Sequence, residues 1–223
     1  MIAASGGNTL ASDTTLTGSW TVLYEDLVAG IMHAMNNSVT VLAVSLELSS
    51  AGDVPGDVPM LRRELTQLTG LIGFTSALSS RSTRHEALDL SGVLELAVTI
   101  HALGPAMRST VCRVHVTGVV PPVRVSPAVL LRVLLLMIDG AKRARVDGSA
   151  AVAIDLSGDT ESVAVGAPLR GSVSPDAVVL AASCGGTLVV QEGRAVFTLP
   201  SLANLRRASL TGGRTTPKRG AGS

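Results

Sequence analysis

The chain has 223 residues and a formal net charge of +1, so no global charge draws it to nucleic acid or anionic lipid. Its composition is 46% hydrophobic but only 2% aromatic, which predicts a sizeable core packed from aliphatic side chains. The two cysteines and four histidines have spacings that match no metal site, and we expect both cysteines to be reduced thiols.

Residues 1–18 are rich in Ser, Thr and Gly and lack a basic start and an apolar centre, so we expect a disordered terminus and no signal peptide. The longest apolar run, Val129 to Ile138, is interrupted by Arg132 and is much shorter than the roughly 20 residues that a membrane span requires. We therefore expect a soluble, cytoplasmic protein without membrane insertion.

An antiparallel helical hairpin is predicted over residues 19–82. Residues 19–50 have the pattern of one long helix, capped near Thr17 or Ser19, and the Gly and Pro residues of 51–56 end it. A second apolar run has helical spacing, with Leu61, Leu65, Leu68, Leu71, Ile72 and Leu78. Such a hairpin commonly pairs with a copy of itself as a four-helix bundle, so we expect a homodimer.

Residues 88–201 have the pattern of a small domain of mixed helices and strands, so the predicted fold class is α+β. Helices are expected at 90–107, 127–144 and 175–183, the second opened by Pro127. Strands are expected at 111–116, 152–156, 162–165, 187–191 and 194–199, the last two joined by a turn at Glu192-Gly193. The basic, Gly- and Ser-rich segment 205–223 is expected to be a disordered tail.

His33 is the candidate for chemistry on the first helix. At about 100° per residue it lies among small and polar residues, with Asp26, Ala29, Gly30, Asn36, Asn37, Thr40, Val44 and Glu47. The apolar stripe falls opposite, with Tyr24, Leu27, Val28, Ile31, Met35, Val39, Leu42 and Leu46. An exposed imidazole can act as a nucleophile and carry a phosphoryl group. Periodicity alone leaves open an ordinary exposed histidine.

The segment around His33 resembles the H-box of sensor histidine kinases, which typically reads Gly-Ile-x-His-Glu-x-Asn-Asn-Pro-Leu-Thr. The matching residues are Gly30, Ile31, His33, Asn36, Asn37 and Thr40. Leu130–Ala144 resembles the helix that carries the kinase N-box, and Cys184–Pro200 resembles the last hairpin of the kinase ATP-binding domain. The resemblance implies a dimerisation and phosphotransfer hairpin followed by a small, degenerate kinase-ATPase-like α/β sandwich.

Three departures from the kinase pattern stand together. Leu135 and Gly140 occupy the positions where the N-box offers asparagines to magnesium and nucleotide phosphates, and neither can ligate a metal. The Asp-x-Gly-x-Gly segment has no counterpart, and the stretch from Gly140 to Gly185 is too short for an ATP lid. Ala34 replaces the acid that is expected to take a proton from the attacking imidazole. ATP-dependent self-phosphorylation is therefore not expected.

What remains is similar to the histidine phosphotransferases that relay phosphate between response regulators. That resemblance implies that His33 accepts a phosphoryl group from a receiver aspartate and passes it to another receiver. Asn36 and Asn37 would assist, and the receiver would dock near Thr40, Val41 and Val44, although a dimer-core role for the two valines stays open. The receiver would supply Mg²⁺, so no cofactor of the chain's own is expected.

Two other functions remain open on the sequence. A non-catalytic pseudokinase would act as a scaffold or inhibitor and would not need His33. A response-regulator phosphatase would use Asn37 to position a water. This resembles the phosphatase activity of the kinases, which uses an acid and an Asn or Thr near the histidine, but Ala34 stands here in place of the acid. The other histidines, His85, His101 and His115, are expected to be structural or solvated.

Overall fold

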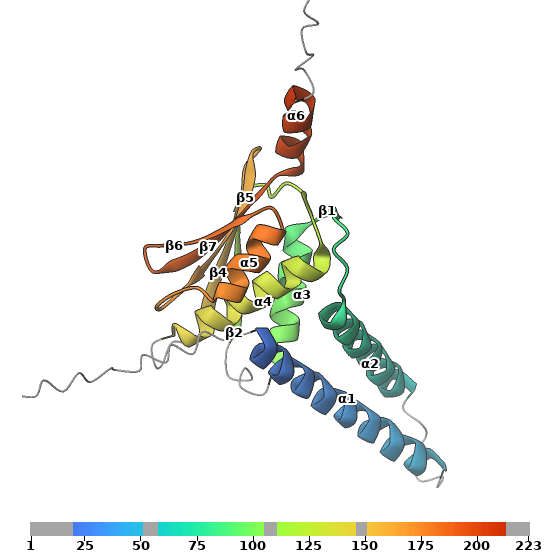
Figure 1. Ribbon diagram of the computed structural model, residues 1–223. Coiled ribbons are helices and arrows are strands. Elements are labelled where there is room, and N and C mark those ends of the chain that lie inside the picture. The colour runs from blue at the N-terminus through green and yellow to red at the C-terminus, as the bar shows by residue number, and fades with distance from the viewer. Residues whose placement is uncertain (1–19, 51–57, 105–110, 146–150, 213–223) are drawn as a thin grey trace, which may run out of the picture.

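The computed structural model describes residues 20–50, 58–104, 111–145 and 151–212. Two long antiparallel helices, α1 (Trp20–Ser50) and α2 (Val58–Ser79), form a hairpin that projects from a body of strands and shorter helices (Figure 1). The fold class is α+β, as predicted, with the helical hairpin first and the mixed sheet after it. The predicted cap at Thr17 or Ser19 and the predicted break at 51–56 lie outside the described residues.

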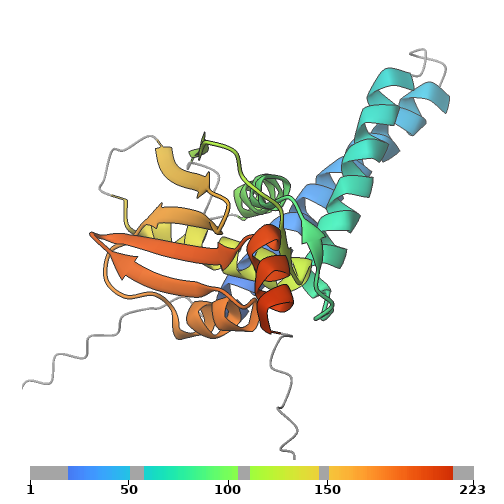
Figure 2. The same ribbon diagram turned by 90° about the horizontal axis from the view of Figure 1, so that it is seen from above.

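A five-stranded sheet forms the centre of the body, in the order β2-β4-β5-β7-β6. The strands are β2 (Val111–Thr117), β4 (Ala151–Gly158), β5 (Ser162–Pro168), β6 (Thr187–Gln191) and β7 (Arg194–Pro200). β2 and β4 pair in parallel, and the other three neighbouring pairs are antiparallel. Three helices pack on one face of this sheet: α3 (Leu90–Leu103), α4 (Pro127–Arg143) and α5 (Pro175–Ser183) (Figures 1 and 2).

The central helix α4 is buried on nearly every side because it lies between the sheet, its two neighbouring helices and the hairpin. Ser126 caps it by accepting a hydrogen bond from the backbone N–H of Val129, and Pro127 occupies the first turn, where no N–H is needed. The strands turn alternate side chains toward it, as in β7, where Phe197 is 1% exposed. The predicted turn between β6 and β7 has positive φ at Glu192 and Gly193, as a two-residue hairpin requires.

The hairpin and the body share one hydrophobic core. Leu23, Leu27 and Ile31 of α1 are at most 2% exposed and pack with residues of α3 and α4. Arg132 of α4 joins both ends of the hairpin: its guanidinium lies 5.3 Å from the centre of the Trp20 ring and donates a 2.6 Å hydrogen bond to the carbonyl of Ser80. The predicted units 19–82 and 88–201 are therefore packed together.

Gly30 is the point of closest approach between α1 and α3. A Cβ atom at this position would lie 2.1 Å from the carbonyl oxygen of Leu103, which no side chain tolerates. The sequence analysis placed Gly30 on the open polar face beside His33, and that placement is wrong because the end of α3 covers this glycine. On the His33 face, Gly30 is covered, whereas Asp26, Ala29 and His33 are exposed.

Three short elements escaped the sequence analysis. A separate two-stranded sheet pairs β1 (Glu86–Leu88) with β3 (Val123–Val125), and a helix, α6 (Leu202–Gly212), follows β7. The prediction of disorder from residue 205 is thus wrong for 205–212. Ser201 begins the helix by accepting a hydrogen bond from the N–H of Asn204, and Arg207 forms a 2.6 Å ion pair with Glu161. Residues 213–223 lie outside the described part.

Helix α1 is long and apolar enough to cross a membrane by length and composition, a test that core helices and signal sequences also pass. Its first turns are buried against the body, whereas the part that carries Val39, Val44 and Leu46 is exposed in the single chain. The two cysteines are free thiols, Cys112 half-buried in β2 and Cys184 buried after α5.

Replacing Gly30 with alanine should lower the free energy of unfolding by about 1–3 kcal/mol, because the added methyl group must displace the backbone of Leu103. Gly73→Ala in α2 is the matched control, since a Cβ there meets nothing within 4 Å and alanine favours helix by up to about 1 kcal/mol. Urea unfolding followed by circular dichroism measures both. Equal effects of the two variants would contradict the contact between α1 and α3.

Candidate functional site

His33 lies on α1 with its side chain exposed, about one turn beyond the contact between Gly30 and α3. Its Nε2 atom is 3.3 Å from Nδ2 of Asn37, which is exposed one turn farther on the same face. An amide NH₂ group can only donate, so Nε2 must be the acceptor and the proton of the neutral ring must sit on Nδ1. Asn37 therefore selects the tautomer in which Nε2 carries a lone pair.

The remaining predicted site residues continue along the same exposed surface. Asn36 uses its backbone carbonyl to accept a 2.9 Å hydrogen bond from the Thr40 hydroxyl, and both side chains are exposed. Val41 and Val44 are 38% and 49% exposed, so they are accessible to a partner. The structure thus brings Asn37 into contact with His33 and places the others beside them on α1.

Ala34, where the resembling kinases have an acid, is half-buried and packs against the core. Asp26, two turns before His33, is exposed, and its negative charge makes a small upward contribution to the pKa of Asp139 and of Lys142 in α4. The Asn37 amide is therefore the polar side-chain partner that the structure gives His33.

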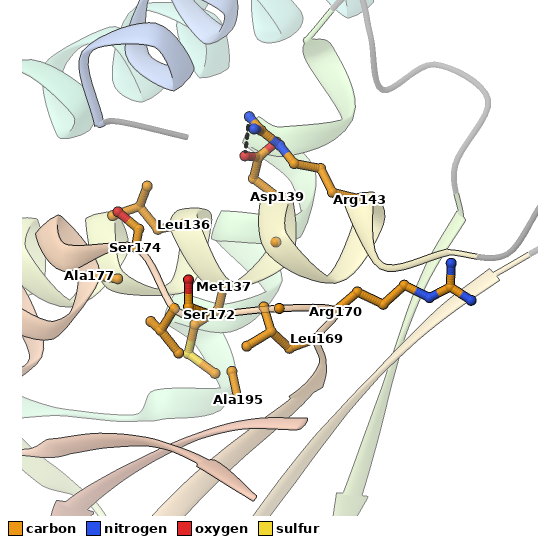
Figure 3. A pocket seen from close by; sticks show the side chains of 13 residues that line it. Leu136, Met137, Asp139, Arg143, Leu169, Arg170, Ser172, Ser174, Ala177 and Ala195 are labelled. Atoms are coloured by element: carbon orange, nitrogen blue, oxygen red, sulfur yellow. Dashed lines mark ion pairs between the residues drawn. The ribbon is translucent and has the colours of Figure 1, made fainter. Parts of the chain in front are cut away.

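A small cavity lies between α4, the start of α5 and the 169–174 connection (Figure 3). Leu136 and Gly140, one turn apart on α4, both line it. Leu135 was expected to occupy one of the two asparagine positions, but it is 0% exposed in the core and does not line the cavity. Leu136, the next residue of α4, is one of those that line it.

The cavity measures about 110 Å³, whereas sites for small organic ligands usually measure about 300–1,000 Å³. Asp139 is 4% exposed and forms a 2.8 Å ion pair with Arg143 on the same helix (Figure 3). Burial raises the pKa of this carboxyl group, and the charge of Arg143 opposes that rise. β5 ends at Pro168 and α5 begins at Pro175, so only residues 169–174 connect them.

The other histidines differ from His33. His85 is exposed in the segment before β1, and His115 is exposed in β2. His101 is 2% exposed, and burial lowers its pKa from the ordinary 6.5 to about 4, with the positive charge of Lys142 acting in the same direction. Within the described ranges, no group of three or more His, Cys, Asp or Glu side chains is arranged to hold a metal ion.

No protein-family model matches the chain, and no curated protein matches it. The similar solved structures are mainly cytoplasmic and catalytic parts of histidine kinases. AdeS of Acinetobacter baumannii is 17% identical over 77% of this chain and 98% of its own, with a TM-score of 0.42. The histidine kinase ThkA, solved in complex with the response regulator TrrA, is 11% identical over 82% of this chain and 63% of its own, with a TM-score of 0.42.

A bacterial phosphotransferase is 14% identical over 81% of this chain and 96% of its own, with a TM-score of 0.37. These identities and TM-scores are too low to assign a function. The function proposed below is therefore argued from the residues of this chain.

Asn37→Ala should shift the neutral His33 ring toward the Nε2–H tautomer, because no donor then holds Nε2 as an acceptor. Asn36→Ala is the control, since its side chain is exposed on the same face and its backbone contact with Thr40 survives. The ¹⁵N chemical shifts of the two ring nitrogens above neutral pH report the tautomer. An unchanged ratio of the two His33 tautomers in Asn37→Ala would show that Asn37 does not select the tautomer.

Proposed function

We propose that this chain is a histidine phosphotransfer protein, in which His33 accepts a phosphoryl group from the aspartyl phosphate of one receiver domain and passes it to the aspartate of another. The observation that supports this most directly is the exposed imidazole whose Nε2 lone pair is held by Asn37. A nucleophilic nitrogen must offer a lone pair at the attacking atom and be reachable by a partner protein; His33 is exposed, and its Nε2 lies beside an amide group that can only donate to it.

The transfer is an exchange of one bond for another. Nε2 attacks phosphorus in line with the aspartyl oxygen, so a P–N bond forms while the P–O bond breaks and the receiver recovers its carboxylate. The ring keeps its Nδ1 proton and becomes a phosphoimidazole with a delocalised positive charge, which favours transfer to the next aspartate. No external oxidant, reductant or nucleotide enters the step.

Asn37 has two successive roles in this proposal. Its amide holds Nε2 free of a proton before the attack, and it must turn away from the lone pair as phosphorus approaches. The same N–H group can then donate to an oxygen of the phosphoryl group, which adds negative charge and strong acceptors at this position. Asn36, on the neighbouring exposed position, offers a second amide to those oxygens.

The proposal requires no ATP and no metal held by the chain. The cavity beside α4 is lined by Leu136 and Gly140 and is small for a nucleotide, which supports the proposal that ATP is not used. Mg²⁺ would come with the receiver domain. The receiver would cover the exposed surface at Thr40, Val41 and Val44, and a response regulator is the kind of partner seen on the similar kinase ThkA.

We place the protein in the cytoplasm, as a homodimer. The buried start of α1 is part of the core of the body, which favours a core helix over a membrane span. Large apolar side chains of the hairpin outside the proposed receiver surface are also exposed in the single chain, and a second hairpin would cover many of them: Val22, Met32, Val39, Leu46, Leu48, Val58, Leu65 and Ile72.

A phosphorylated receiver domain from the same genome should transfer its label to the wild-type chain and not to His33→Ala. The label should be acid-labile and base-stable, as expected for phosphohistidine. His115→Ala is the matched control, because this second histidine is also exposed but lies in β2, and it should accept label like the wild type.

Other outcomes of the same assay identify the competing functions. Receivers that keep their label throughout a panel would favour a pseudokinase scaffold over the relay. Release of free phosphate without a labelled intermediate would favour a phosphatase that uses Asn37 to position water.

Light scattering should give twice the chain mass of 22.7 kDa. Val39→Glu should convert the dimer to a monomer, because this valine lies opposite His33 on α1 and is 53% exposed in the single chain. Val179→Glu in α5 is the control with the same chemical change at a 69% exposed position outside the hairpin. A wild-type monomer would exclude the four-helix-bundle arrangement.

A further inference from the structure

A groove rich in arginine lies on the side of the body where α6 stands beside the small β1–β3 sheet (Figures 1 and 2). It measures about 490 Å³ and receives Arg84, Arg124 and Arg206 from three separate segments of the chain. All three side chains are exposed, and none of them has an ion-pair partner within the described residues. Glu86 is the single carboxylate in the lining.

The backbone register explains why these arginines converge. In β3, Val123 and Val125 are buried, so Arg124 between them must point away from the core. Ala87 of β1 is the direct partner of Arg124 in the antiparallel pair, so both side chains lie on the same outer face and form the floor. The chain that bridges to β3 at Ser201 then enters α6, which forms the second wall.

The wall contributed by α6 is fixed by specific contacts. The N–H of Leu202 donates to the carbonyl of Pro122 at 2.8 Å, and the side-chain amide of Asn204 donates to the carbonyl of Glu161 at 3.0 Å. Leu202 and Leu205 are half-buried and line the groove, while Arg206 stands at its rim. The groove therefore combines the apolar side chains of Leu202 and Leu205 with three arginines from separate segments.

We propose that this groove binds an acidic segment of a partner protein, one that carries carboxylates separated by apolar side chains. Guanidinium groups bind carboxylates through paired hydrogen bonds, and three unpaired ones around one groove attract a chain with several negative charges. The apolar strip of Leu202 and Leu205 suits a partner side chain such as leucine or valine, which a nucleic-acid backbone does not offer. A groove enclosed by a helix and a strand admits an extended chain more readily than a broad bilayer surface.

This docking site is independent of the phosphotransfer proposed for His33, since it lies on other elements and uses no residue of the hairpin helices. The chain's net charge of only +1 means that attraction arises at this local cluster rather than from the whole molecule.

The test is fluorescence anisotropy with the full chain and a fluorescein-labelled peptide of alternating glutamate and apolar residues. Arg124→Glu should weaken binding about tenfold or more, which corresponds to about 1.4 kcal/mol. The same peptide with lysine in place of glutamate should bind the wild type poorly and should bind Arg124→Glu better than it binds the wild type. Arg206→Glu, on the surface of α6, should also weaken the acidic peptide, and it tests the groove without altering β3.

Arg113→Glu is the matched control, because this arginine is exposed in β2, outside the groove, and the net charge changes equally. Absence of binding to the wild type, or an equal loss in Arg113→Glu, would overturn the proposal. Vesicles containing phosphatidylglycerol and a DNA duplex are measured in parallel. If vesicles or DNA bound more tightly than the acidic peptide, and Arg124→Glu and Arg206→Glu weakened that binding, the groove would be a site for that ligand and the proposal would be overturned.

Discussion

The arrangement of the molecule depends on the contact between α1 and the end of α3, where Gly30 lets two backbones approach as no other residue would. This contact divides α1 into two parts. The part before it supplies Leu23 and Leu27 to the core of the body, and the part after it runs along α2 into solvent. His33 lies about one turn past the division, so it is anchored by a rigid core while its ring remains exposed.

Arg132 strengthens the same junction from the side of the body. It extends from the buried helix α4 to Trp20 at the start of α1 and to Ser80 just past the end of α2. Asp176 adds a third link, because its carboxylate accepts a hydrogen bond from the N–H of Trp20. Together these contacts give the hairpin a defined orientation on the body, so a partner that docks at His33 meets a surface of fixed shape.

The sequence was sufficient for elements whose pattern is local. Pro127 after Ser126 marks the start of α4, Glu192-Gly193 marks the β6–β7 turn, and the apolar periodicity gives both hairpin helices. The sequence was insufficient for elements that form only through tertiary contacts. β1 and β3 are only three residues long and exist through pairing, and α6 is stabilised by Ser201 and Glu161, which a reading of composition does not weigh.

The candidate site shows the same division between local and tertiary information. Helical spacing places Asn37 within reach of His33, and the structure has that contact. The same spacing places Gly30 on the open face, because a helical wheel does not include α3. Tertiary contacts also separate two neighbours on α4: Leu135 is 0% exposed in the core, whereas Leu136 lines the cavity.

The proposed His33 site and the arginine-lined groove lie on separate parts of the molecule, and this separation has a functional consequence. His33 and Asn37 lie on the projecting hairpin, whereas Arg84, Arg124 and Arg206 surround a groove on the body. The contacts at Gly30 and Arg132 join the hairpin to the body, so they would set the position of a protein bound in the groove relative to His33. A tethered partner of that kind would raise the local concentration of its other domains near His33, provided its linker spans the distance.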